Sequence, residues 1–236
     1  MAGSGTGTRT GNGDDRFALK RARMVAEQIR ARGIRDPSLL AAMATVPRET
    51  FVPAALAERA YEDGALGIGS GQTISQPYIV ARMIDALRLP EWRRRHPDQV
   101  PLVLDVGTGS GYGAAVLSAM GTRVIGIERD EELARSARER LDALGYPVEI
   151  HVGDGSAGWP DAAPYAGIVV AAAAPDVPEP LIAQLSDGGR VIVPVGSRIH
   201  QELKVVERAG DHLREEWLEP CVFVPLVGRY GFAEKI

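Results

Sequence analysis

Apolar residues in the second half of the chain occur in short runs separated by glycine-rich and polar turns. The runs at residues 103–106, 123–127 and 148–152 each have the length of a strand buried inside a sheet. Four further strand candidates follow, at residues 168–173, 190–195, 202–207 and 221–226. Helix-forming segments such as residues 178–185 separate the early runs. This order predicts an α/β fold, a doubly wound and mostly parallel sheet that ends in antiparallel strands.

The first part of the chain has helical spacing instead. The apolar positions Met24, Val25 and Ile29 lead to a glycine at residue 33, which is typical of a helix end. A second helical segment covers residues 37–46, and a third covers residues 78–89. These segments predict a small helical cap in front of the sheet.

The two patterns divide the chain into four parts. Residues 1–16 are rich in Gly, Thr and Ser and are predicted to be a disordered tail. Residues 17–90 form the helical cap together with a polar loop, and residues 101–236 form the domain with the sheet. Between them, residues 91–100 are predicted to be an exposed surface connection, because prolines and charges bracket them.

Composition limits the classes of function. The chain has 236 residues, of which 45% are hydrophobic, so it can bury one substantial core. Its 27 basic and 31 acidic residues give no electrostatic reason to expect a nucleic-acid partner. The single cysteine, Cys221, excludes an internal disulfide, and four scattered histidines show no metal-ligand spacing. The N-terminus has no apolar stretch that could be a signal peptide or a membrane span, so we expect a cytoplasmic enzyme that does not bind membranes. We also expect a monomer that holds no metal.

The glycine-rich segment after the first strand is the most specific motif. Residues 103–111 read Val-Leu-Asp-Val-Gly-Thr-Gly-Ser-Gly, and Gly107, Gly109 and Gly111 leave room for a ligand beside the backbone. A dinucleotide fingerprint requires a glycine where this chain has Tyr112, which argues against a nicotinamide oxidoreductase. The spacing is instead typical of nucleoside-binding methyltransferases. The alternative is that the three glycines only allow tight packing.

Acidic residues follow the next two strands. Glu128 ends the second strand, and one carboxylate at such a strand end can accept hydrogen bonds from both hydroxyls of a ribose. The alternative for Glu128 is a solvated charge at the start of an acidic helix. Asp154 lies between two glycines after the third strand, where it could accept from the amino group of an adenine. An ordinary turn explains Asp154 equally well.

A polar loop, Gly-Ile-Gly-Ser-Gly-Gln-Thr-Ile-Ser-Gln-Pro at residues 67–77, precedes the glycine motif. It is too polar and too rich in glycine for a core segment, so we expect a flexible loop. Ser75 or Gln76 could simply cap the helix that Pro77 begins. The other interpretation is a catalytic use of Ser75.

The polar loop and the glycine motif belong to a longer ordered set of motifs between about Met24 and Leu226. Taken together, this set resembles the protein-L-isoaspartate O-methyltransferases. The other members of the set are Gly153-Asp154-Gly155, Gly158-Trp159-Pro160, Ala163-Pro164-Tyr165, Pro194-Val195-Gly196 followed by Gln201, and Phe223-Val224-Pro225-Leu226.

The resemblance implies a Rossmann-like class I methyltransferase that uses S-adenosylmethionine to methylate the free α-carboxyl group of isoaspartyl residues in damaged proteins. The ester then closes to a succinimide, whose hydrolysis returns some normal aspartate. The resemblance places the active-site serine at Ser75. It places the cofactor-binding residues at Thr73, Ile74, Gly107, Gly109, Glu128, Asp154 and Gly155, and we add Asp105 and Gly111 of the glycine motif.

The chain departs from the family pattern at two positions. Ala166 stands where an aspartate is usual, and Ala171 stands where a threonine is common. We expect neither departure to touch the methyl-transfer geometry. Two alternatives remain, a relative that methylates aspartates in ribosomally made peptides and a non-catalytic nucleoside-binding adaptor. The intact residues 73–75 argue against the adaptor.

Overall fold

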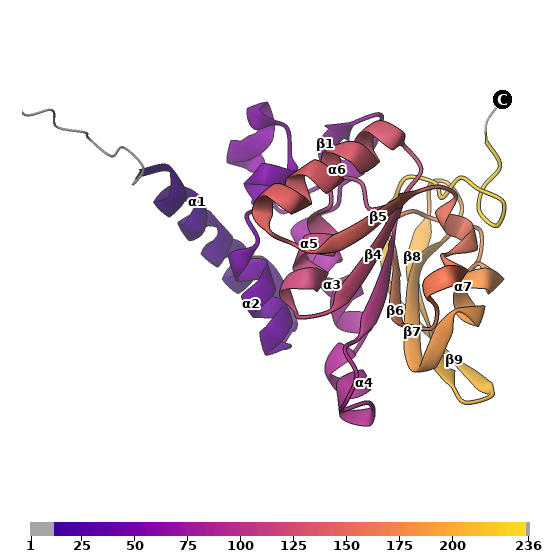
Figure 1. Ribbon diagram of the computed structural model, residues 1–236. Helices are drawn as coiled ribbons and strands as arrows, with labels where there is room; N and C mark the ends of the chain where they lie inside the picture. Colours follow the sequence, from indigo (N-terminus) through magenta and orange to yellow (C-terminus); the bar gives the residue numbers. More distant parts are fainter. Residues whose placement is uncertain (1–11, 235–236) are drawn as a thin grey trace, which may run out of the picture.

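Seven strands form one sheet in the computed structural model, which describes residues 12–234 (Figure 1). The strand order is β5-β4-β3-β6-β7-β8-β9, and β3 to β7 run parallel while β8 and β9 are antiparallel to their neighbours. This arrangement confirms the predicted fold class. The strands are β3 Leu102–Val106, β4 Arg123–Glu128, β5 Val148–Val152, β6 Tyr165–Val170, β7 Leu185–Gly196, β8 Gln201–Ala209 and β9 His212–Cys221.

The central strands are buried on both faces. In β3, Val103 packs into one apolar cluster while Leu104 and Val106 pack into the other. Strands buried in this way have continuous apolar sequences, which is why the short runs could be recognised. Three helices cover the first face and α7 the second (Figure 1). The helices are α3 Pro77–Ala86, α5 Tyr112–Ala119, α6 Glu131–Leu144 and α7 Glu179–Ala183.

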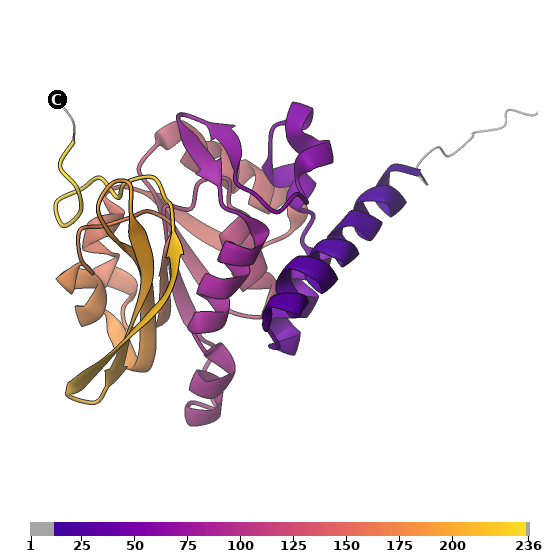
Figure 2. The same cartoon turned by 180° about the vertical axis from the view of Figure 1, so that it is seen from behind.

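The first two helices of the chain and the antiparallel strands lie at opposite sides of the molecule (Figure 2). Helix α1, Asn12–Arg23, continues through a π-helical turn, Met24–Ile29, and the segment ends at Gly33. Gly33 has a φ of 99°, a conformation in which glycine is favoured. Helix α2, Pro37–Thr45, begins where the Asp36 carboxylate accepts from two backbone N–H groups. Helix α1 begins at Asn12 and so includes residues 12–16 of the predicted tail, and the rest of that tail lies outside the described residues.

Two other segments differ from their predictions. Part of the predicted surface connection is helix α4, Leu89–Arg95, with Pro90 in its first turn. Trp92 of α4 is buried, and its indole N–H donates to the Ser186 hydroxyl at 3.0 Å. The predicted strand at residues 221–226 is also wrong, because β9 ends at Cys221 and only Pro225 of the remaining residues forms an isolated bridge.

The predicted flexible loop is ordered as a hairpin. Strand β1, Leu66–Gly69, pairs antiparallel with β2, Gln72–Ile74. Gly69 at the end of β1 and the two turn residues, Ser70 and Gly71, all have positive φ, a conformation that is sterically acceptable at the two glycines. The hairpin therefore fixes the residues that follow it. None of the helices within residues 12–234 is long and apolar enough to cross a membrane.

Candidate active site

The direction in which successive strands are added to the sheet reverses between β3 and β6. From β3 the chain proceeds outward to β4 and β5, and it then returns to β6 on the other side of β3. Ligands of doubly wound sheets bind at the carboxyl ends of the strands at such a point. Two adjoining cavities of about 60 and 130 Å³ lie there, and both have Thr73 and Ala171 in their walls. We call them the acceptor cavity, which contains Ser75, and the nucleoside cavity, which contains Glu128.

Ser75 lies between the hairpin and helix α3 and lines the acceptor cavity with Thr73 and Ile74. The residue at the cap position of α3 is Gln76, and no side chain makes a cap hydrogen bond there. The Gln76 amide donates to the Asp63 carboxylate instead, at 2.8 Å. Neither Ser75 nor Gln76 therefore caps α3 with its side chain, which was the alternative to a catalytic use of Ser75.

The three glycines of the motif have different surroundings. Gly107 and Gly109 line the nucleoside cavity, with φ angles of 78° and 53°. Gly111 lies outside the walls of both cavities. A Cβ at Gly111 would lie 3.1 Å from the Leu141 side chain on α6, so this glycine allows close packing of α6. For Gly111 the structure therefore favours the alternative that the glycine only allows tight packing. Gly111 borders neither cavity, so nothing in the structure supports its predicted role in cofactor binding.

Glu128 is only 8% exposed, which contradicts the alternative of a solvated charge. One carboxylate oxygen accepts from the Gly109 N–H at 2.8 Å. The other accepts from the N–H groups of Arg129 and Asp130 at 2.7 and 3.0 Å. A carboxylate offers about four lone-pair sites, so these bonds orient the group and leave the oxygen near Gly109 able to accept from a ligand. The arrangement fits a ribose.

Asp105 lines the acceptor cavity and is buried. Burial raises the pKa of Asp105 to about 7, and the negative charge of Glu128 adds to this effect. A cationic ligand in the cavity would favour the ionised carboxylate, because it supplies the opposite charge that the protein does not.

Asp154 does not line either cavity. One of its oxygens accepts from the Ser156 N–H at 2.9 Å, and the other accepts from the Arg229 N–H at 2.7 Å. The carboxylate thus stabilises a turn and holds the C-terminal segment, as the turn alternative expected. Its neighbour Gly155 does line the nucleoside cavity, and a Cβ there would lie 2.5 Å from a methyl group of Val106.

Sequence reasoning missed several residues of the site. Leu226 and Val227, from the segment that Asp154 holds, form one wall of the nucleoside cavity. Tyr112 lines the acceptor cavity, although the sequence singled it out only as a missing glycine. Ala171, one of the two departures from the family pattern, lines both cavities.

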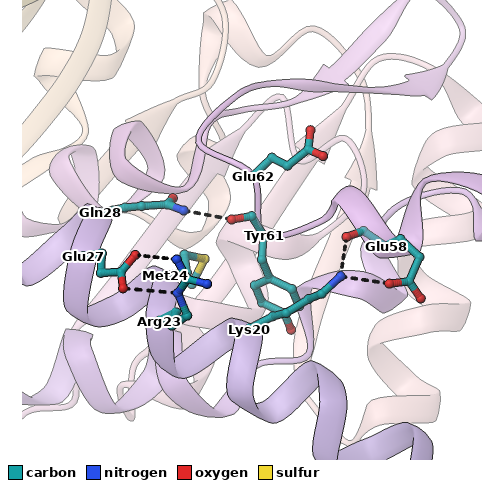
Figure 3. A pocket seen from close by; sticks show the side chains of 8 residues that line it. All are labelled: Lys20, Arg23, Met24, Glu27, Gln28, Glu58, Tyr61 and Glu62. Carbon is teal, nitrogen blue, oxygen red and sulfur yellow. Dashed lines mark hydrogen bonds and ion pairs between the residues drawn. The ribbon is translucent and has the colours of Figure 1, made fainter.

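A further cavity of about 290 Å³ lies on the helical cap, away from the strand ends (Figure 3). Its charged side chains form ion pairs, Lys20 with Glu58 and Arg23 with Glu27. These pairs leave little unbalanced charge to attract a ligand, so the strand ends remain the candidate site. Within the described residues, no three His, Cys, Asp or Glu side chains gather in a way that could hold a metal ion.

Comparison with known proteins identifies the family of the chain. A family model described as protein-L-isoaspartate(D-aspartate) O-methyltransferase (PCMT) matches residues 20–231. Protein-L-isoaspartate O-methyltransferase 2 of Pelobacter propionicus is 54% identical over 216 residues, which cover 90% of this chain and 92% of that relative. The protein-L-isoaspartate O-methyltransferase of Methanoregula boonei is 50% identical over 214 residues, covering 90% and 95%.

Solved structures agree on the fold. A protein-L-isoaspartate O-methyltransferase is 29% identical with a TM-score of 0.75, and the match covers 89% of this chain and 67% of that one. A Plasmodium falciparum protein, solved in complex with S-adenosyl-L-homocysteine, is 24% identical with a TM-score of 0.71, covering 88% and 98%. The motif resemblance is confirmed, and the chain belongs to the protein-L-isoaspartate(D-aspartate) O-methyltransferase family.

Proposed function

We propose that the chain methylates the free α-carboxylate of isoaspartyl residues in damaged proteins, that Ser75 orients this acceptor, and that the ester enters repair through a succinimide. Family membership supports the activity. The residue assignment depends on one observation. The cavity that contains Ser75 and the cavity that contains Glu128 meet at Thr73 and Ala171, so a methyl donor and an acceptor can be adjacent.

The residues of the nucleoside cavity fit S-adenosylmethionine, whose sulfonium group supplies an activated methyl group. Glu128 would hold the ribose, because its carboxylate is oriented at the strand end and borders the cavity. Gly107 and Gly109 would let the cofactor approach the backbone. Asp105 in the neighbouring cavity would favour the cofactor's positive charge.

The acceptor needs placement more than activation. An ionised carboxylate is already a nucleophile, so the transfer needs no strong base. Ser75 can donate its hydroxyl hydrogen to one carboxylate oxygen and so direct the other oxygen at the methyl carbon. Val80, Ile84 and Val169 give the acceptor cavity an apolar wall. Excluding water favours the transfer, because positive and negative charge cancel as the methyl group moves.

Two peptides that differ only in an aspartyl or isoaspartyl linkage test the proposal with labelled S-adenosylmethionine. We expect label in the isoaspartyl peptide alone, because the longer arm of the normal side chain misplaces its carboxylate. Comparable labelling of both peptides would contradict the repair function. Cofactor binding without transfer would indicate an adaptor, and transfer to one particular sequence would indicate a dedicated peptide methyltransferase. Monomeric action in the cytoplasm stays a prediction, and sedimentation of the purified chain tests its first part.

A further inference from the structure

Arg48 connects the helical cap to the polar loop at residues 67–77. It begins the short 3-10 turn Arg48–Phe51, and its side chain is completely buried. Its Nε donates to the carbonyl of Ala60 at 2.6 Å, and its Nη2 donates to the carbonyl of Ser75 at 2.7 Å. The guanidinium also lies over the ring of Tyr112, 4.8 Å from the ring centre. Arg48 is therefore bonded directly to the residue assigned to the acceptor.

The burial of Arg48 is not explained by charge pairing. No carboxylate of the described chain forms an ion pair with it, and its Nη1 is buried without an acceptor. Burial lowers the pKa of this guanidinium, and Tyr112 and Tyr61 only partly oppose the effect. A buried cation without a carboxylate is costly, and apolar side chains of similar volume often replace buried charges without loss of stability. Costly buried polar groups of this kind cluster at functional sites.

The cap segment that Arg48 bonds, at residues 60–61, is itself held in place. The Gln28 amide donates to the carbonyl of Tyr61 at 2.8 Å (Figure 3). Tyr61 follows Ala60, whose carbonyl accepts from Arg48. On the near side, Ser75 and Tyr112 both line the acceptor cavity. The guanidinium thus lies directly behind the cavity wall, between an anchored cap segment and the Ser75 backbone.

We propose that Arg48 is a positioning residue for the methyl transfer. By holding the Ser75 carbonyl it fixes the direction of the Ser75 hydroxyl, and its uncompensated positive charge favours an anionic acceptor over a neutral one. This inference rests on the proposed function, because it assumes that the acceptor is a carboxylate beside Ser75.

The test compares Arg48→Met, which removes the charge and both bonds, with Arg48→Lys, which keeps the charge but loses the planar fork. Arg93→Met is the matched control, because Arg93 also donates to two backbone carbonyls, those of Met120 and Gly121, away from the cavities. Each protein is assayed for kcat and KM with the isoaspartyl peptide, for cofactor Kd by calorimetry, and for thermal unfolding.

For Arg48→Met we expect both a higher KM for the peptide and a lower kcat, with a combined loss of about 10²-fold, the order of magnitude for slight misplacement. Arg48→Lys should keep the parental KM within about threefold and lose only kcat, by about tenfold. The cofactor Kd should change less than about twofold in all variants, and Arg93→Met should match the parent in kcat, KM and cofactor Kd.

A parental kcat in Arg48→Lys, or parental kinetics in Arg48→Met, would overturn the inference. A loss of cofactor affinity that parallels the loss of activity would also overturn it, because that result indicates a purely structural role. If Arg48→Met does not fold, the split between kcat and KM in Arg48→Lys decides. Absence of methylation by the parent protein would refute the proposed function and the inference with it, whereas an active parent whose Arg48 variants keep its kinetics would refute the inference alone.

Discussion

Replacing Asp105 with asparagine should stabilise the cofactor-free protein and remove part of its pH dependence. Burial, with a contribution from the charge of Glu128, raises the pKa of Asp105 from its ordinary value of 3.8 to about 7. Between these two values the folded protein keeps the proton while the unfolded chain has lost it. The unfolded state then binds fewer protons, so the free energy of unfolding falls as the pH rises from 4 to 7.

The size of the effect follows from the shift. Each pKa unit corresponds to about 1.4 kcal/mol, so a shift of about three units costs the folded protein up to about 4 kcal/mol above pH 7. The cost is already about 1.5 kcal/mol at pH 5, because the unfolded carboxyl is mostly ionised there. The Asp105→Asn variant carries no such cost. Its stability advantage over the parent should therefore grow by about 2.5 kcal/mol between pH 5 and pH 8.

Urea unfolding of both proteins at pH 5 and pH 8, without cofactor, measures this difference. A second readout is calorimetric titration with S-adenosylmethionine at pH 6 in two buffers of different ionisation enthalpy. The parent should release a proton on binding, because the cationic ligand favours the ionised Asp105, whereas the asparagine variant should release none. A stability difference that is equal at both pH values would refute the raised pKa of Asp105.

Three further substitutions test the site. Ser75→Ala should lower turnover by about 10²-fold with little change in melting temperature, and a variant that melts earlier but methylates at the parental rate would show that Ser75 is structural. Glu128→Ala should weaken cofactor binding by about 1.5–3 kcal/mol in calorimetry, and unchanged affinity would exclude a ribose contact. Gly155→Ala should destabilise the protein by about 1–3 kcal/mol in urea unfolding, because the new methyl group would meet Val106, and parental stability would show that β3 can move aside.

The sequence allowed prediction of the parts of the fold that are buried on both faces. The runs that became β3 and β4 are apolar because both sides of each strand meet a core, whereas β5 is an edge strand in which only Ile150 is buried. The order of the three runs predicted the parallel sheet. Strand β9 was missed because its residues are mostly exposed on both sides, so its sequence shows no apolar alternation. The apolar residues 223–226 pack against the sheet without extending β9, and sequence alone does not distinguish the two uses of such a run.

Residues of the candidate site could be predicted where a short sequence motif contains them. They could not be predicted where their role depends on contacts with distant parts of the chain. Ser75 and Glu128 follow short motifs at strand ends, and the structure brings their cavities together. Gly111 and Asp154 belong to equally good motifs, yet their contacts are with a helix and with a distant backbone group. Arg48 has no local signal, because its partners lie 12 and 27 residues away along the chain.

The C-terminal wall of the nucleoside cavity has a consequence for the order in which the protein matures. Leu226 is held by its backbone bond to the carbonyl of Ala173, and the segment just beyond it is held by Asp154. Thr73 lines the same cavity, so the binding site needs residues from both halves of the chain. A ribosome-bound chain that ends before Val224 could assemble the parallel strands but not this wall. Cofactor affinity should therefore be acquired only after synthesis has passed this segment, and cofactor retention would report on the integrity of the C-terminal region.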